Sequence, residues 1–145
     1  MEKPVFVDAE IVKEDWSVYK VEDGTIVKVR YVLVKARKGT ANQFGQPGYD
    51  LSMKNIIGMI PRPGGLDKPS VSYDKATLTQ SIEKEDMEFE KIREPWNEYR
   101  MSDGSTIKIQ AILTIVSRTS KYDENGEQIY LLNFQPIVKA LPPHK

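Results

Sequence analysis

The chain has no cysteine, a single histidine and no long apolar run, and each absence removes a class of function. Without cysteine there is no disulfide, no thiolate nucleophile and no cysteine-based zinc site. The one histidine, His144, stands in a Pro-Pro-His-Lys tail, so we expect neither serine nor cysteine catalysis that depends on a histidine base. No segment has the apolar length of a signal peptide or of a membrane-spanning helix, which makes the cytoplasm the default location and a larger particle a compatible one.

The chain also lacks an excess of either charge. Its 145 residues contain 21 Lys and Arg against 21 Asp and Glu. A net charge of zero argues against a protein whose main task is to neutralise nucleic-acid phosphates or to bind an anionic membrane. The hydrophobic fraction of 39% and the charged fraction of 29% are ordinary values, so the composition excludes a collagen-like or wholly disordered chain.

The strongest positive pattern is an internal repeat, which emerges when the chain is compared with itself at an offset of 80 residues. The sequence Trp-x-x-Tyr-x-x-x-Asp-Gly begins at Trp16 and again at Trp96. At an offset of 81, a second set recurs: Arg37, Gly45, Tyr49 and Pro61 correspond to Arg118, Gly126, Tyr130 and Pro142. We therefore predict a gene duplication, with residues 1–63 as the first copy, 64–84 as a linker and 85–145 as the second copy.

Within each copy the apolar residues recur at every second position, which is typical of β-strands. Val27, Val29, Tyr31 and Leu33 alternate with more polar residues, and the stretch that begins at Ile107 does the same. Further along, Val32, Val34 and Ala36, like Ile112 and Val116, make the second face apolar as well. We expect this part of each strand to be covered on both sides.

The two Asp-Gly pairs predict hairpin turns and also fix the strand register. A two-residue loop would place the preceding tyrosine and the following aliphatic residues on opposite faces. A three-residue loop that ends in a left-handed glycine keeps them on one face. It pairs Tyr19 with Val27 and Tyr99 with Ile107, and we predict this register.

Each copy thus reads as four antiparallel strands, the first over residues 5–12 or 87–92 and the other three in a meander. Asn125-Gly126 and Phe44-Gly45 are turn signals between the third and fourth strands. Pro136 lies inside its strand, where it predicts an edge or a bulge because proline cannot donate to the ladder. Residues 77–82 of the linker could add a further strand.

The predicted fold class is all-β. Sixty residues are marginal as an independent domain, so we expect the two copies to share one core. They would form a pseudo-twofold β-barrel or sandwich with extended hairpins.

Repeated carboxylates are the first candidates for chemistry. They could chelate a hard cation, for example between Glu10 and Glu90, or supply an acid–base pair. The plainer interpretation is an exposed strand face paired with basic neighbours, which we favour. No catalytic, cofactor-binding or metal-binding residue is therefore assigned. The repeated carboxylates are Asp8, Glu10, Glu14, Glu88, Glu90 and Glu94.

Repeated basic and aromatic residues are the second candidates. The rings could stack on the bases of a single strand while Lys28, Arg37, Lys108 and Arg118 hold its phosphates. The alternative, which we favour, is that the rings fill the core, because they fall in phase with the apolar face. The rings in question are Trp16, Tyr19, Tyr49, Trp96, Tyr99 and Tyr130.

These observations favour a non-enzymatic structural or protein-interaction module. It would form a homo-oligomer, or dock on a larger assembly such as a particle surface, through β edges and hairpin arms. A nucleic-acid-binding β module that uses the four basic residues is the alternative, and an enzyme or a carrier of a small ligand between the two copies is the third hypothesis.

Overall fold

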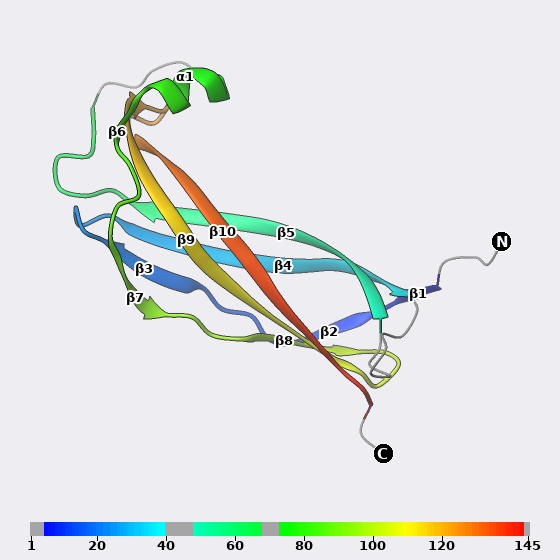
Figure 1. Cartoon of the computed structure of the whole chain (residues 1–145). Helices are drawn as coiled ribbons and strands as arrows, with labels where there is room; N and C mark the ends of the chain where they lie inside the picture. Colours follow the sequence, from blue (N-terminus) through cyan, green and yellow to red (C-terminus); the bar gives the residue numbers. More distant parts are fainter. Residues whose placement is uncertain (1–4, 40–47, 68–72, 144–145) are drawn as a thin grey trace.

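A computed structural model of the chain describes residues 5–39, 48–67 and 73–143, and there it contains ten strands and one short helix. The strands form two five-stranded antiparallel sheets whose long ribbons cross each other (Figure 1). The all-β prediction is therefore confirmed. Of the two predicted arrangements, barrel or sandwich, a closed barrel is not found, because the strands of the described part divide between two separate sheets.

The first sheet is built around the long strand β4 (Ile26–Gly39). One edge of β4 pairs with β5 (Gly48–Ile60), and its other edge pairs with β3 (Ser17–Val21) and then with β1 (Val5–Val7). A strand from the second half of the chain, β7 (Phe89–Arg93), pairs with β3.

The second sheet has the same arrangement around β9 (Thr106–Tyr122). One edge of β9 pairs with β10 (Gln128–Leu141), and its other edge pairs with β8 (Asn97–Met101) and with β6 (Ile82–Lys84). A strand from the first half of the chain, β2 (Ala9–Lys13), pairs with β8. Each half of the chain therefore gives one strand to the sheet of the other half.

The predicted strand count of eight is wrong, and so are the bounds of the first strand predicted for each copy. Residues 5–12 divide at Asp8 into β1, which stays in the first sheet, and β2, which crosses to the second. The predicted strand over residues 87–92 begins at Phe89 as β7, and β6 precedes it. Alternation along the chain does not reveal such a division, because both pieces keep a strand-like pattern.

The predicted turn register is confirmed at both Asp-Gly sites. Tyr19 lies opposite Val27, and Tyr99 lies opposite Ile107. Gly24 and Gly104 have φ angles of 96° and 88°, in the left-handed region that only glycine adopts without strain.

The turn between β9 and β10 has the same design. Gly126 has a φ of 79°, and its N–H donates to the Asp123 carbonyl at 3.0 Å. The corresponding Phe44-Gly45 turn and His144 lie outside the described residues.

The prediction of two covered faces along the third strand is wrong, and the reason is a β-bulge. The register between β4 and β5 shifts between Leu33 and Lys35, so Val34 is an extra residue. Side chains after it reverse their faces. Ala36 is consequently buried, while the Val34 side chain is 54% exposed.

The predicted linker strand over residues 77–82 is also wrong for most of its length. Lys75–Gln80 form the helix α1, and only Ile82 belongs to a strand. The Asp74 side chain accepts a hydrogen bond from the Thr77 N–H at 2.7 Å, which is an N-cap that starts the helix. No helix in the described part of the chain has the length and apolar character needed to cross a membrane.

Two buried apolar clusters hold the sheets together. One surrounds Tyr19, the other surrounds Tyr99, and each takes residues from both sheets. Tyr31 packs against both clusters, and its ring contacts Phe134 of the opposite sheet with 5.7 Å between centroids. The face-to-face packing of the sheets thus places Tyr19 and Tyr99 at corresponding positions of two similar cores.

Candidate functional site

Two buried tyrosines reach carboxylates that belong to the other half of the chain. The Tyr19 hydroxyl donates to Glu94 Oε2 at 2.5 Å, and the Tyr99 hydroxyl donates to Glu14 Oε2 at 2.7 Å. Each phenol oxygen also accepts a backbone N–H from the opposite sheet. Burial, and then the hydrogen bond to the carboxylate, raises the pKa of both phenols. The phenols therefore keep their protons at neutral pH and tie the two halves together.

A second pair of tyrosine–aspartate bonds lies at the Asp-Gly turns. The Tyr130 hydroxyl donates to Asp23 Oδ2 at 2.5 Å, and Tyr49 donates in the same way to Asp103. Burial alone would raise the pKa of Asp23, but hydrogen bonds from Tyr130, Thr25 and Arg118 outweigh it and hold that pKa below its usual value. Sequence reasoning assigned the aspartates only a turn role and missed these partners, although all four residues recur in the repeat.

Arg118 extends the Asp23 cluster. Its Nη1 lies 3.0 Å from Asp23 Oδ2, and its Nε donates to Glu83 Oε1 at 2.7 Å. Arg62 approaches the same aspartate with Nε at 3.7 Å and donates to Gln128 Oε1 at 3.1 and 3.0 Å. Two cations and two carboxylates thus neutralise each other at this end of the molecule.

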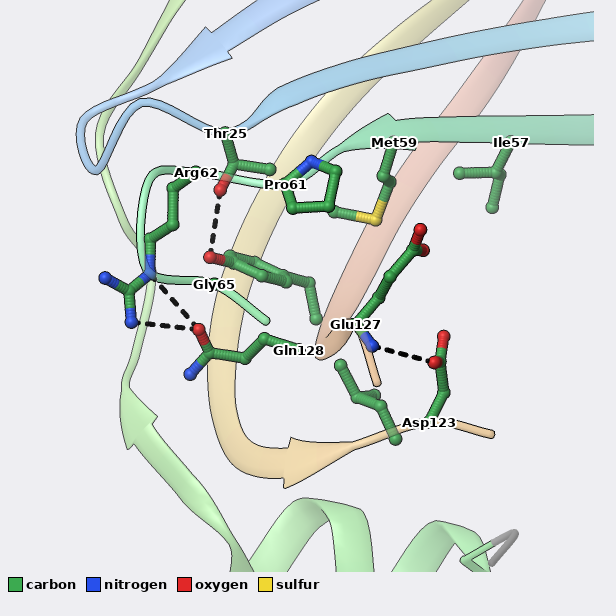
Figure 2. A pocket seen from close by; sticks show the side chains of 11 residues that line it. Thr25, Ile57, Met59, Pro61, Arg62, Gly65, Asp123, Glu127 and Gln128 are labelled. Atoms are coloured by element: carbon green, nitrogen blue, oxygen red, sulfur yellow. Dashed lines mark hydrogen bonds between the residues drawn. The ribbon is translucent and has the colours of Figure 1, made fainter. Parts of the chain in front are cut away.

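A cavity of about 280 Å³ opens beside this cluster (Figure 2). Ile57, Met59 and Ile129 give it an apolar side. Arg62 and Tyr130 line the polar side, and both are engaged in the bonds described above. The volume lies just below the range of about 300–1,000 Å³ that is typical of small-molecule sites. Among the described residues no group of three or more His, Cys, Asp or Glu side chains is placed to hold a metal ion.

The repeated carboxylates on the first strands lie opposite basic residues. Glu10 faces Arg100 across β2 and β8, and Glu90 faces Lys20 across β7 and β3. Opposite charges at such positions stabilise a sheet. The structure therefore places Glu10 and Glu90 in two different sheets, as members of cross-strand pairs.

The four basic residues of the nucleic-acid hypothesis do not form one patch. Arg37 lies near the end of β4 and Arg118 near the end of β9, and these strand ends point to opposite ends of the molecule (Figure 1). Arg37 pairs with Asp50 at 2.6 Å, Lys108 lies 3.7 Å from Glu98, and Arg118 belongs to the Asp23 cluster. Lys28 lies opposite Gly58.

The two tryptophans have similar surroundings, which differ from the core position expected for them. The Arg30 guanidinium lies 4.7 Å from the Trp16 ring centroid, and the Lys139 ammonium lies 4.5 Å from that of Trp96. Both rings are half-buried, so each is covered by a cation of the same chain. Tyr19 and Tyr99, in contrast, are buried in the core as expected.

The long strands β5 and β10 are edge strands. In the described part of the chain β5 pairs only with β4, and β10 pairs only with β9. The prediction of an edge at Pro136 is thereby confirmed. Both strands expose large apolar side chains, namely Ile56, Ile57, Ile60, Ile137, Val138 and Leu141.

Comparisons with protein-family models, with curated proteins and with solved structures found no match for this chain.

Proposed function

We propose that this protein is a non-enzymatic structural module that associates with further copies of itself through the free edges of its long β ribbons. The observation that carries the proposal is the pair of edge strands, β5 and β10, which are 13 and 14 residues long. An edge strand presents a row of unpaired N–H and C=O groups, and exposed apolar side chains add to its tendency to pair. Four of these side chains, at Ile56, Ile57, Ile137 and Val138, are 40–43% exposed.

The reciprocal bonds between the halves support the duplicated, pseudo-twofold architecture that belongs to this proposal. The Tyr19 bond to Glu94 and the Tyr99 bond to Glu14 join residues that correspond at an offset of 80. The backbone N–H groups of Glu22 and Ser102 likewise donate to Glu88 and Asp8 at 2.9 and 2.8 Å. A duplication that exchanges one strand in each direction accounts for all four bonds.

The polar side chains support a structural role over catalysis. Those that recur in the repeat are engaged with each other, as tyrosine–carboxylate pairs and ion pairs that link strands. The nucleic-acid alternative has weaker support, because three of its four basic residues already have acidic partners.

Native mass spectrometry, together with light scattering over a concentration series, tests the proposal. We expect a homo-oligomer whose fraction rises with concentration. A monomer at every concentration, with no partner retained in a pull-down, would count against self-association and against docking on a larger assembly.

A further inference from the structure

We infer that two copies of this chain join through the free edges of their β5 strands, antiparallel, with Ser52 facing Ser52 of the second copy across a twofold axis. The inference rests on the proposed self-association and specifies its surface and register. A continuous sheet would then run from β4 of one copy through both β5 strands to β4 of the other.

The two edge strands differ at one corresponding position. Asn55 of β5 lies opposite Tyr31, and Pro136 of β10 lies opposite Ala111, so the two residues occupy the same place in their ribbons. A proline inside a strand is tolerated where its missing N–H would face away from the ladder. The free edge of β10 therefore lacks a donor at its middle, whereas Asn55 retains that donor on β5.

The same position fixes which backbone groups of β5 face outward. If the missing donor of Pro136 faces the free edge of β10, the N–H of Asn55 at the corresponding position faces the free edge of β5. The backbone groups of Leu51 and Met53 then face that edge as well, because the backbone groups of successive residues point to alternate sides of a strand. Two antiparallel β5 strands must bring outward-facing groups opposite each other. Only registers that pair odd-numbered residues with odd-numbered residues satisfy this condition, and they also keep core-facing side chains on one face.

The charges on β5 then select one of these registers. Asp50 and Lys54 are its only charged residues, and both are exposed on the same face. Asp50 also bonds Arg37 of its own chain at 2.6 Å. Full overlap of the two strands would place Lys54 opposite Lys54 of the second copy, which is unfavourable. A twofold axis at Ser52 instead places each Asp50 opposite a Lys54 of the other copy. Of the permitted registers, it is the one that pairs both charges with opposite charges.

This register also brings apolar side chains of the two copies together on the other face of the strand. Leu51 and Met53 are half-buried and pack against the cluster around Tyr99. With the axis at Ser52, Leu51 lies opposite Met53 of the second copy. The apolar surface of each core would therefore continue across the interface, beneath the two Asp50–Lys54 pairs.

A pair of charge variants tests the register directly. In Asp50→Lys chains, or in Lys54→Glu chains, the interface would contain only like charges. The dimer dissociation constant of each variant alone should therefore be higher than that of the wild type by about tenfold or more. In a mixture, both pairs become complementary, and native mass spectrometry should show the heterodimer as the main dimer. Folded single variants that dimerise as well as the wild type, or a mixture without heterodimer, would overturn the register.

A proline variant tests the edge itself. Asn55→Pro copies the residue that β10 carries at the corresponding position, so the fold should accept it while the dimer dissociates. Circular dichroism and thermal unfolding confirm folding. In the cysteine-free chain, Ser52→Cys should form an intermolecular disulfide on oxidation, and the corresponding Asn133→Cys on β10 should not.

The outcomes separate this inference from the proposed function. A wild-type dimer that persists in Asn55→Pro, with no disulfide through Ser52→Cys, would overturn the β5 interface and leave self-association in place. A wild-type monomer at every concentration would overturn both.

Discussion

The Tyr19 hydroxyl, buried between the sheets, donates a 2.5 Å hydrogen bond to Glu94 Oε2. Glu94 follows β7 directly, in the segment where the chain leaves the first sheet for β8 of the second. The bond therefore links the core of the first sheet to the segment through which the chain passes from β7 into the second sheet. Tyr99 and Glu14 make the same connection at the other crossing.

Tyr19→Phe and Tyr99→Phe should each lower the free energy of unfolding by about 1–3 kcal/mol, because each leaves a carboxylate oxygen and a backbone N–H without their partner. Urea denaturation measures the change. Tyr31→Phe is the matched control, since the described residues give its hydroxyl no hydrogen bond while its ring packs on Phe134. An equal loss in all three variants would show that the hydroxyl bonds do not carry the effect.

Stability should fall at alkaline pH through the same two phenols. Their pKa values are raised in the folded protein, first by burial and then by the neighbouring carboxylates. The neutral phenol is thus favoured by folding, and this contribution is complete below the unfolded value of about 10 and is lost as the pH rises above it.

Unfolding free energies measured between about pH 8 and about pH 12 should decline less in the Tyr19→Phe/Tyr99→Phe double variant than in the wild type. A parallel decline in both proteins would contradict the assignment.

Stability should fall in acid as the aspartates of the two Asp-Gly turns, Asp23 and Asp103, become protonated. The pKa values of Asp23 and Asp103 are lowered in spite of burial, because tyrosine and backbone donors favour the carboxylate. Their contribution is present above the unfolded pKa of about 3.9 and is lost as the pH falls below it.

Asp23→Asn and Asp103→Asn should therefore lower stability near neutral pH and flatten its decline in acid, as measured by chemical denaturation from about pH 7 to about pH 2. The exposed Glu85→Gln serves as the control for a general charge effect. An acid decline as steep as that of the wild type would contradict the prediction.

The turn register was predictable because it depends on local chemistry. Asp, Gly and the parity of the flanking apolar residues lie within a few positions of each other, and together they allow only one loop length. The bulge at Val34 was not predictable, because a valine fits either face of a strand and the shift appears only against β5. The strand exchange depends on contacts between β2 and β8, which join residues 85 to 92 positions apart along the chain and which alternation does not encode.

The candidate site was predictable in its residues but not in its contacts. The comparison of the chain with itself singled out Tyr19, Tyr49 and Asp23, together with their counterparts, as matching positions of the predicted repeat. It could not show that the tyrosine of one half bonds the carboxylate of the other, because matching residues within a copy say nothing about which copy supplies the partner. The corresponding positions 55 and 136 carried a further signal, the proline present in only one copy.

Glycine at the turns should be essential to stability at two positions. Gly24→Ala and Gly104→Ala would place a side chain at a φ of 96° or 88°, at a cost of about 1–2 kcal/mol each. Gly104→Ala should cost more, since its Cβ would lie 3.2 Å from Pro143 Cβ, against 3.6 Å from Pro63 Cδ at Gly24. Thermal unfolding compares them with Gly58→Ala, whose nearest contact would be Lys28 Cβ at 3.9 Å. A loss no larger than that of Gly58→Ala would show that the left-handed turn is not needed.

The corresponding arginines should respond differently to substitution, and the difference separates a structural role from phosphate binding. Arg118 is 19% exposed and bonds Asp23 and Glu83, so Arg118→Gln should cost about 1.5–3 kcal/mol of stability. Arg37 is 48% exposed beside Asp50, and Arg37→Gln should cost about 0–1 kcal/mol. Gel-shift titration of wild type and both variants against single-stranded DNA over a salt series completes the test. Phosphate binding would weaken steeply with salt and would be reduced in both variants. We expect no salt-dependent shift in any of the three, because both guanidinium groups already have carboxylate partners within the chain.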